Sequence, residues 1–436
     1  MLKRFLFKFF LFSVIFFAVS AILSVFLIND LNTYTRVLMH EFYSQKNIDV
    51  LFCGASHVSH GINPDVADKR LGLNTFNSGT PSQGLDGTYA ILCEAVRLYN
   101  LKDVFVELDF ATAATSPYSK SEPSKSNFLV AHYLKNPKAK LKYILSSTSP
   151  KYYFNSFLPI GKEKLIDLNP VSVLSVAKSK ITGNYYKYSY EKSDSVYAGK
   201  GCVLDDETVQ NGTLWSEPVN PIPVDSIDAE WKEIIVKIIS LCNENNINLA
   251  FYQNPSTDFY LAEKQSYDEY ISFIRKIVSE YNIQYYDFSL LKPEYLEFQD
   301  SDFFDDNHLN KYGIEKFTSI FCDFYSRTEL ERSRMFYHSF SEKQAAQKLR
   351  IYGLIIEENK DFGFFTVEPV CNRSDTTLIT YDVSFFDGTF ENEKFIAEKS
   401  NECKFFYPPK TSGKLKITSY YDDAVQNIIT KYFTAL

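Results

Sequence analysis

Short apolar runs alternate with amphipathic stretches from about residue 48 to residue 327. Runs rich in β-branched and aromatic residues predict buried strands, and apolar residues three and four positions apart predict helices between them. The predicted strands are Val50–Cys53, Asn74–Asn77, Val104–Leu108, Leu249–Gln253 and Gln284–Phe288. The predicted helices are Ile62–Leu71, Leu85–Tyr99, Ala229–Asn243, Tyr267–Tyr281 and Lys311–Ser326. This alternation with short links predicts an α/β fold, a mostly parallel sheet with helices on both faces.

The N-terminus carries the longest apolar run of the chain. Residues 9–28 contain no charged side chain and follow a short basic flank, and about twenty apolar residues suffice to cross a bilayer. We therefore expect residues 1–28 to be a single transmembrane anchor, with the remainder of the chain outside the cytoplasm of a bacterial cell. The alternative is a cleaved signal peptide with its small-residue site at Ala18–Ala21, but the apolar run continues past that site.

Three further segments complete the predicted organisation. Residues 29–47 are expected to form a polar, partly helical stalk, and residues 48–330 the catalytic α/β domain. Within that domain, residues 111–228 are rich in Ser, Lys, Tyr and Pro and interrupt the alternation. This insertion is interpreted either as a lid or acceptor-binding subdomain or as a partly disordered excursion. Residues 348–436 contain short β-branched and aromatic runs divided by turn residues, which predicts a small β-rich accessory domain of sandwich type.

Composition narrows the classes of partner. Aromatic residues make up 16% of the chain, ample for a core and for sugar-facing surfaces. The net charge of -8, without a long basic run, argues against nucleic acid as the main partner. Seven cysteines show no metal-ligand spacing. Four of them lie in apolar periodic stretches and are expected to be buried, and Cys371 and Cys403 are candidates for a disulfide.

The candidate chemistry lies in two segments about 250 residues apart. The first predicted strand ends in Gly54-Ala-Ser-His57, which places Ser56 on a tight turn. The second segment, Asp305-Asp-Asn-His308, precedes the last predicted helix. A serine hydroxyl needs a base within hydrogen-bond reach and a third group to orient that base. We expect His308 to be the base and Asp305 to be the group that orients it.

The order of these motifs resembles the SGNH (GDSL-like) hydrolase superfamily, whose sheet is flavodoxin-like. The sequence motifs around Ser56 and His308, together with the anchor, most resemble those of membrane-anchored envelope proteins that O-acetylate polysaccharides or take part in teichoic-acid D-alanylation. The resemblance covers residues 48–327 without most of the insertion. It implies Ser56 as nucleophile with His308 and Asp305, and oxyanion donors at the backbone N–H groups of Ser56 and Gly79. The family's Gly-x-Asn-Asp block is absent, which leaves Asn254 as a substitute donor.

Other polar residues follow the predicted strands as well. His57 and Asp109 are candidate substrate-binding residues, with Glu107 a strand-end or acceptor-binding group. A metal site that combines His57 and His60 with His308 and an aspartate is disfavoured, because a nucleophile turn explains Ser56 and the spacing fits no usual zinc pattern. The two histidines are expected at the surface or the rim of the site. None of these patterns predicts a cofactor.

Three functions follow from this interpretation. The first is serine-dependent transfer of an acyl group, most simply acetyl, from a membrane acyl-donor protein to an envelope or secreted polysaccharide or a teichoic-acid-like acceptor. The second is hydrolysis of a carbohydrate or lipid ester by the same triad. The third is a non-catalytic envelope scaffold or binding protein. The anchor, the insertion and the accessory domain favour the transferase, largely by analogy.

Overall fold

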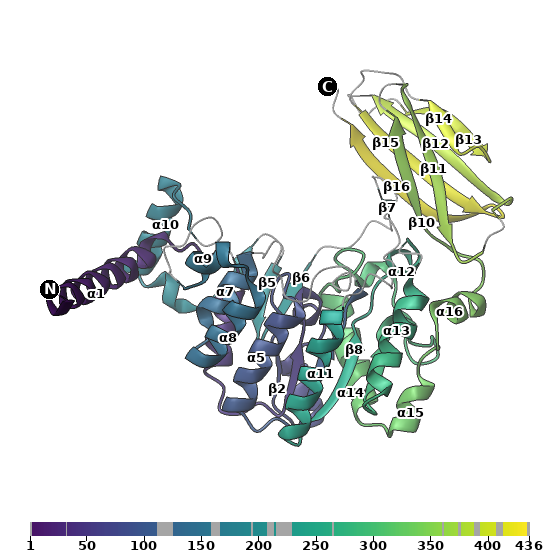
Figure 1. Ribbon diagram of the computed structural model, residues 1–436. Coiled ribbons are helices and arrows are strands. Elements are labelled where there is room, and N and C mark those ends of the chain that lie inside the picture. The colour runs from purple at the N-terminus through teal and green to yellow at the C-terminus, as the bar shows by residue number, and fades with distance from the viewer. Residues whose placement is uncertain are drawn as a thin grey trace.

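We analysed a computed structural model of the chain (Figure 1). The residues described are 2–31, 33–110, 125–157, 166–192, 195–206, 213–214, 229–263, 266–359, 362–373, 376–387, 393–406 and 413–433.

A five-stranded parallel sheet forms the centre of the main domain, in the order β2-β1-β3-β8-β9. Its strands are β1 (Val50–Cys53), β2 (Thr75–Asn77), β3 (Asp103–Glu107), β8 (Asn248–Gln253) and β9 (Gln284–Asp287). Counted along the chain, this is the order 2-1-3-4-5 of a doubly wound sheet. All five strands match the predicted ones to within one residue at either end, and the α/β prediction is confirmed.

Helices cover both faces of this sheet (Figure 1). Alternate residues of β1 point to opposite faces, so that Leu51 and Cys53 join one apolar core while Val50 and Phe52 join another. The first core is covered by α5 (Leu85–Leu98), α11 (Ala229–Glu244), α12 (Asp258–Glu263) and α13 (Tyr267–Ser279). The second is covered by α3 (Ser56–Ser59), α4 (Pro64–Leu71) and α14 (Lys311–Tyr325).

The N-terminal helix α1 (Leu2–Leu27) is long and apolar enough to cross a membrane, and its side chains are almost entirely exposed. The next helix, α2 (Thr35–Phe42), does not behave as the predicted stalk. Leu38, Met39 and Phe42 are fully buried in the first core of the main domain. The apolar residues of this short segment repeat at helical spacing, so α2 packs against the sheet instead of spacing it from the membrane.

The insertion is substantially folded where the structure describes it. Its helices are α7 (Lys125–Tyr133), α8 (Pro137–Ser147), α9 (Tyr153–Phe157) and α10 (Pro170–Ile181), and its strands are β4 (Glu191–Lys192), β5 (Ser195–Gly199), β6 (Cys202–Asp205) and β7 (Thr213–Leu214). The turn between β5 and β6 docks on the sheet, where Asn77 N donates to Lys200 O at 2.9 Å. Residues 111–124, 158–165, 193–194, 207–212 and 215–228 of the predicted insertion lie outside the described residues.

Two sheets, antiparallel apart from the β7–β10 pair, make up the C-terminal part and share one apolar core (Figure 1). Helices α15 (Glu329–Arg334) and α16 (Phe340–Ala346) lead into it. Its strands are β10 (Ile351–Asn359), β11 (Phe364–Cys371), β12 (Ile379–Asp387), β13 (Glu393–Ser400), β14 (Lys404–Phe406), β15 (Gly413–Tyr421) and β16 (Ala424–Phe433). One sheet has the order β14-β11-β10-β7, so β7 of the insertion pairs with the C-terminal part.

The cysteines agree with the expectation only in part. Cys53, Cys242 and Cys322 are buried, but Cys93 is half-buried. Cys371 and Cys403 are not bridged, and all seven thiols of the chain are free in the described structure.

Candidate functional site

Ser56 lies at the carboxyl end of the parallel sheet, where it is the first residue of α3 after the short turn that follows β1. Two glycines allow the backbone to close there. A Cβ at Gly79, after β2, would lie 2.3 Å from Ala55 O, and a Cβ at Gly54 would lie 2.8 Å from Glu107 Cβ. Both distances are shorter than real contacts, so neither position accepts a side chain unless the backbone moves. The Gly79 segment is thereby packed against the turn that carries Ser56.

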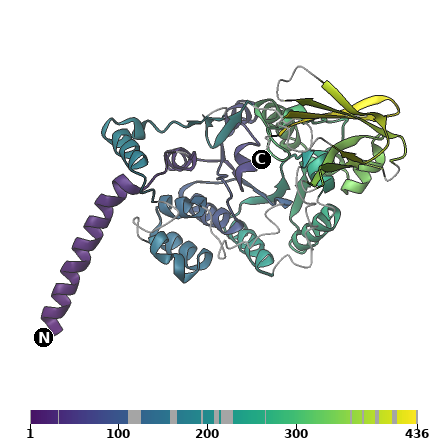
Figure 2. The ribbon, with the colours of Figure 1, turned by 90° about the horizontal axis from the view of Figure 1, so that it is seen from above.

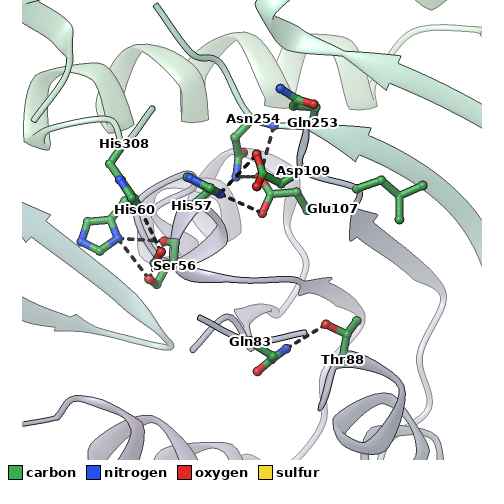
Figure 3. Close-up of polar contacts among 12 residues, drawn as sticks. Ser56, His57, His60, Gln83, Thr88, Glu107, Asp109, Gln253, Asn254 and His308 are labelled. Atoms are coloured by element: carbon green, nitrogen blue, oxygen red, sulfur yellow. Dashed lines mark hydrogen bonds and ion pairs between the residues drawn. The ribbon is translucent and has the colours of Figure 1, made fainter. Parts of the chain in front are cut away.

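The structure brings the three predicted catalytic residues together, and Figure 3 shows Ser56 and His308 in contact. Ser56 Oγ lies 2.8 Å from His308 Nε2. On the far side of the imidazole, His308 Nδ1 lies 2.9 Å from both carboxylate oxygens of Asp305. Asp305 Oδ1 also accepts hydrogen bonds from the backbone N–H groups of Asn307, at 3.0 Å, and of His308, at 2.8 Å. The loop therefore fixes the carboxylate, and the carboxylate fixes the ring.

The surroundings of this loop keep His308 neutral. Burial lowers the pKa of His308, the positive charge of His57 lowers it further, and the two outweigh the opposing effect of Asp305, which brings that pKa to about 4. Burial would raise the pKa of Asp305, but the hydrogen bond from His308 prevails and the pKa is lowered. At neutral pH the group is thus a free imidazole base beside an ionised carboxylate.

The sequence predicts His57 at the surface or the rim of the site, and this prediction is wrong: His57 is only 7% exposed. Its Nδ1 lies 3.7 Å from Oε2 of Glu107, the last residue of β3, and 3.8 Å from Oδ1 of Asp109, which follows that strand. Burial alone would lower the pKa of His57, but the charges of Asp109 and Glu107 outweigh it and raise the pKa to about 9. His57 is a buried cation, and its ring stacks on that of His308 with centroids 4.4 Å apart (Figure 3).

Asn254, the candidate oxyanion donor, is committed to another partner. Its Nδ2 donates to Glu107 Oε1 at 2.9 Å, and the side chain is buried at the end of β8. Asn254 therefore belongs to the cluster of His57, Glu107 and Asp109 (Figure 3). The backbone N–H groups of Ser56 and Gly79 remain the candidate donors for an oxyanion, since both belong to segments packed around the turn that carries Ser56.

Sequence reasoning missed one residue of the site. Asp205, at the end of β6 in the insertion, lies 2.7 Å from His60 Nε2 and is buried. His60 Nδ1 in turn lies 2.8 Å from Ser56 O. The hydrogen bond with His60 overcomes burial and lowers the pKa of Asp205. No motif marks this aspartate, and only a buried strand pattern at β6, Cys-Val-Leu before Asp205, hints at its burial.

This arrangement can activate a hydroxyl. A neutral imidazole within hydrogen-bond distance of Ser56 can accept its proton, and the carboxylate behind the imidazole stabilises the cation that forms. Among the residues described, no group of three or more His, Cys, Asp or Glu side chains is placed to hold a metal ion.

Comparisons with known proteins add little to this geometry. No family model matches the chain, and no curated protein matches it. A solved structure of a modular endo-β-1,4-mannanase from Cellulomonas fimi is 9% identical with a TM-score of 0.16, and covers 94% of this chain and 100% of its own. A double mutant of the C. fimi endo-β-1,4-mannanase is 10% identical with a TM-score of 0.15, and covers 93% and 99%. Scores this low carry no argument about fold or function.

Proposed function

We propose that this chain is an SGNH-type serine acyltransferase that works at the outer face of a bacterial cell membrane. The observation that carries the proposal is the 2.8 Å contact between Ser56 Oγ and His308 Nε2, with Asp305 on the other ring nitrogen. The strand order, Ser56 after β1, Gly79 after β2 and the late Asp305–His308 loop support the resemblance to this superfamily. The family's Gly-x-Asn-Asp block, expected after β3, is absent. Glu107 and Asp109 stand in its place, and their carboxylates lie beside His57.

The first half-reaction would load the acyl group on Ser56. The Ser56 proton moves to His308 Nε2 while the Oγ–C bond to the acyl carbon forms, and the carbonyl oxygen becomes an oxyanion facing the backbone N–H groups of Ser56 and Gly79. The bond between the acyl carbon and the donor's leaving group then breaks. The leaving group takes the proton from His308, which returns to its neutral form.

The second half-reaction would pass the acyl group on. His308 accepts the proton of an acceptor hydroxyl, the acceptor oxygen attacks the acyl carbon, and the ester to Ser56 breaks with return of the proton to Oγ. A glycan hydroxyl as acceptor makes the chain a transferase, and water makes it an esterase. The apolar helix α1 favours the transferase, because it would hold the site beside a membrane acyl donor and near envelope polymers.

The experiment compares envelope polysaccharide acylation in cells that carry wild-type protein or Ser56→Ala. Base-labile acyl groups per sugar are measured after the polymer is purified. Ser59→Ala is the matched control, because Ser59 lies in the same short helix but its hydroxyl bonds to Tyr34 Oη and to the backbone carbonyl of Ser56, each at 2.8 Å, and not to His308. Loss of acylation in Ser56→Ala alone supports the transferase, and unchanged acylation rules it out. Rapid release of acyl groups from simple esters by the purified full chain would favour the esterase.

A further inference from the structure

Helix α10 carries an apolar stripe that no described part of the protein covers. Val171, Leu174 and Ile181 are 75%, 69% and 80% exposed. At 100° per residue these three positions lie together on the side opposite Val176, which is buried. Leu168, just before the helix, is 73% exposed as well. Exposed leucine, valine and isoleucine on one side of a folded helix indicate a surface with a partner.

The helix lies against the last turn of α1. Before α10, Ile166 forms a β-bridge with Ile28, and Asp167 N donates to Leu27 O at 3.3 Å. At the other end of α10, Lys180 Nζ bonds to Val25 O. Both ends of α10 therefore contact the last turn of α1, and the helix lies beside the end of α1 (Figure 2). A helix in this position would run along a bilayer surface that α1 crosses.

The segments that follow α1 and α10 are joined by buried polar contacts. Tyr185 Oη donates to Asp30 Oδ2 at 2.8 Å, and Asp30 is fully buried. An Arg36 guanidinium nitrogen donates to Tyr185 O at 2.5 Å and the group lies 4.5 Å over the Tyr185 ring. These contacts hold α10 in a fixed position relative to the helix α1 and to the main domain, so its apolar stripe is not a feature of a loose arm.

We propose that α10 is a second membrane-contact element, with its apolar stripe buried in the outer surface of the bilayer that α1 crosses. Amphipathic helices bind in this way with the apolar side among the upper acyl chains. Lys178 lies within the stripe, and its long side chain can reach the phosphate level while its stem stays in the apolar layer. The bilayer is the occupant that the structure favours, because α10 is held against the end of α1, whose side chains are exposed and apolar over the length of a membrane span.

This inference rests on the membrane anchoring included in the proposed function, but not on the serine chemistry. It implies that the main domain is held at two points, which fixes the tilt of the domain and the height of Ser56 above the membrane. The insertion would then supply both a membrane contact, through α10, and a residue beside the candidate site, Asp205.

The test measures tryptophan fluorescence of the full chain in phosphatidylcholine nanodiscs, with and without bromine on the lipid acyl chains close to the headgroup. Leu174→Trp is compared with Leu330→Trp, a site 63% exposed on α15 and far from α1 in Figure 1. Val171→Trp is the second variant in case Leu174→Trp disturbs folding. The parent protein, which has two tryptophans, sets the background. We expect at least a twofold greater loss of the added signal for Leu174→Trp or Val171→Trp than for Leu330→Trp.

Equal quenching of the α10 variants and Leu330→Trp overturns the inference, whether a protein partner or a second copy covers the stripe instead. Phe12→Trp in the middle of α1, with lipid brominated deep in the chain, separates this failure from that of the anchor. If Phe12→Trp is quenched and the α10 variants are not, α1 spans the bilayer and α10 does not touch it. If Phe12→Trp is not quenched, the anchoring itself fails.

Discussion

Two histidines stack beside Ser56 and differ in charge at neutral pH: His308 is neutral and His57 is a cation. His308 has one carboxylate, Asp305, on a half-buried loop, and its pKa falls to about 4. His57 lies between the buried carboxylates of Glu107 and Asp109, and its pKa rises to about 9. Burial acts on both rings in the same direction. The number of carboxylates around each ring, and the charge of one ring on the other, decide which histidine takes the proton.

This difference separates two roles at one site. His308 is free to accept a proton from Ser56, whereas His57 already carries one and cannot act as a base at neutral pH. The cation of His57 also makes protonation of His308 less favourable, so His308 stays available at acid pH. Substitutions at the histidines and at their carboxylate partners test this division of roles, and replacement of the base has the largest expected effect.

Replacement of the base should cost the most. His308→Asn removes the proton acceptor of Ser56, and we expect its reaction with a fluorophosphonate to slow on the order of 10⁴-fold. The rate is measured by intact-mass spectrometry at neutral pH. His338→Asn, which changes an exposed histidine outside the site, is the matched control and should react at the wild-type rate. A His308→Asn rate within tenfold of wild type would remove His308 from the mechanism.

Loss of the charge on His57 should be visible in stability. The pKa of His57 is about 9 in the folded chain, above the ordinary 6.5 expected in the unfolded chain. Its contribution is therefore fully present below about pH 6.5 and lost as pH rises through about 9, an effect of roughly 3 kcal/mol. Urea unfolding between these pH values should show this loss in wild type and not in His57→Gln. Parallel pH dependences for the two proteins would contradict a charged His57.

The same substitution should move the acid limb of the reaction with Ser56. Without the neighbouring cation, the pKa of His308 rises from about 4 toward its ordinary value, so His57→Gln should lose the base at higher pH than wild type. Near pH 5 the variant should react on the order of tenfold more slowly, with little difference near pH 8. Fluorophosphonate capture across this range provides the measurement. An acid limb at the same pH in both proteins would show that the charge of His57 does not affect the pKa of His308.

The third histidine gives the smallest effect. His60 bonds to Asp205 and to Ser56 O but not to the Ser56 hydroxyl. We expect Asp205→Asn to lower the free energy of unfolding by about 1–3 kcal/mol, because a charged hydrogen bond is lost. Capture of Ser56 should stay within tenfold of wild type. A much larger fall in the capture rate, with the fold intact, would place Asp205 in the chemistry itself.

The features that could be predicted from the sequence are those that a short stretch of residues specifies. The five strands follow from buried apolar runs, and Ser56 and the Asp305–His308 loop follow from their place after strands. The charge on His57 is not specified in this way, since it depends on two carboxylates that reach it from β3 only when the sheet forms. The role of Asp205 could not be predicted from the sequence, because Asp205 lies far from His60 in the chain and meets it only when the insertion folds onto the main domain.

Two features of the N-terminal region show the same limit. Residues 29–47 contain enough charge to suggest a stalk, yet α2 is covered by side chains from distant helices. The apolar residues of α10 look like core residues in the sequence. Only the folded structure shows that they are exposed and that the helix lies at the end of α1. Burial against distant segments is a property of the folded chain, which periodicity alone does not report.

The central claim is that Ser56 is an activated nucleophile, and mapping the site of covalent capture tests it most directly. The full chain is treated with a fluorophosphonate, digested, and sequenced by mass spectrometry. The account predicts an adduct on Ser56 that is absent in Ser56→Ala, retained in Ser59→Ala and strongly reduced in His308→Asn. A folded wild-type chain that gives no adduct on Ser56, or the same labelling in Ser56→Ala, would contradict it.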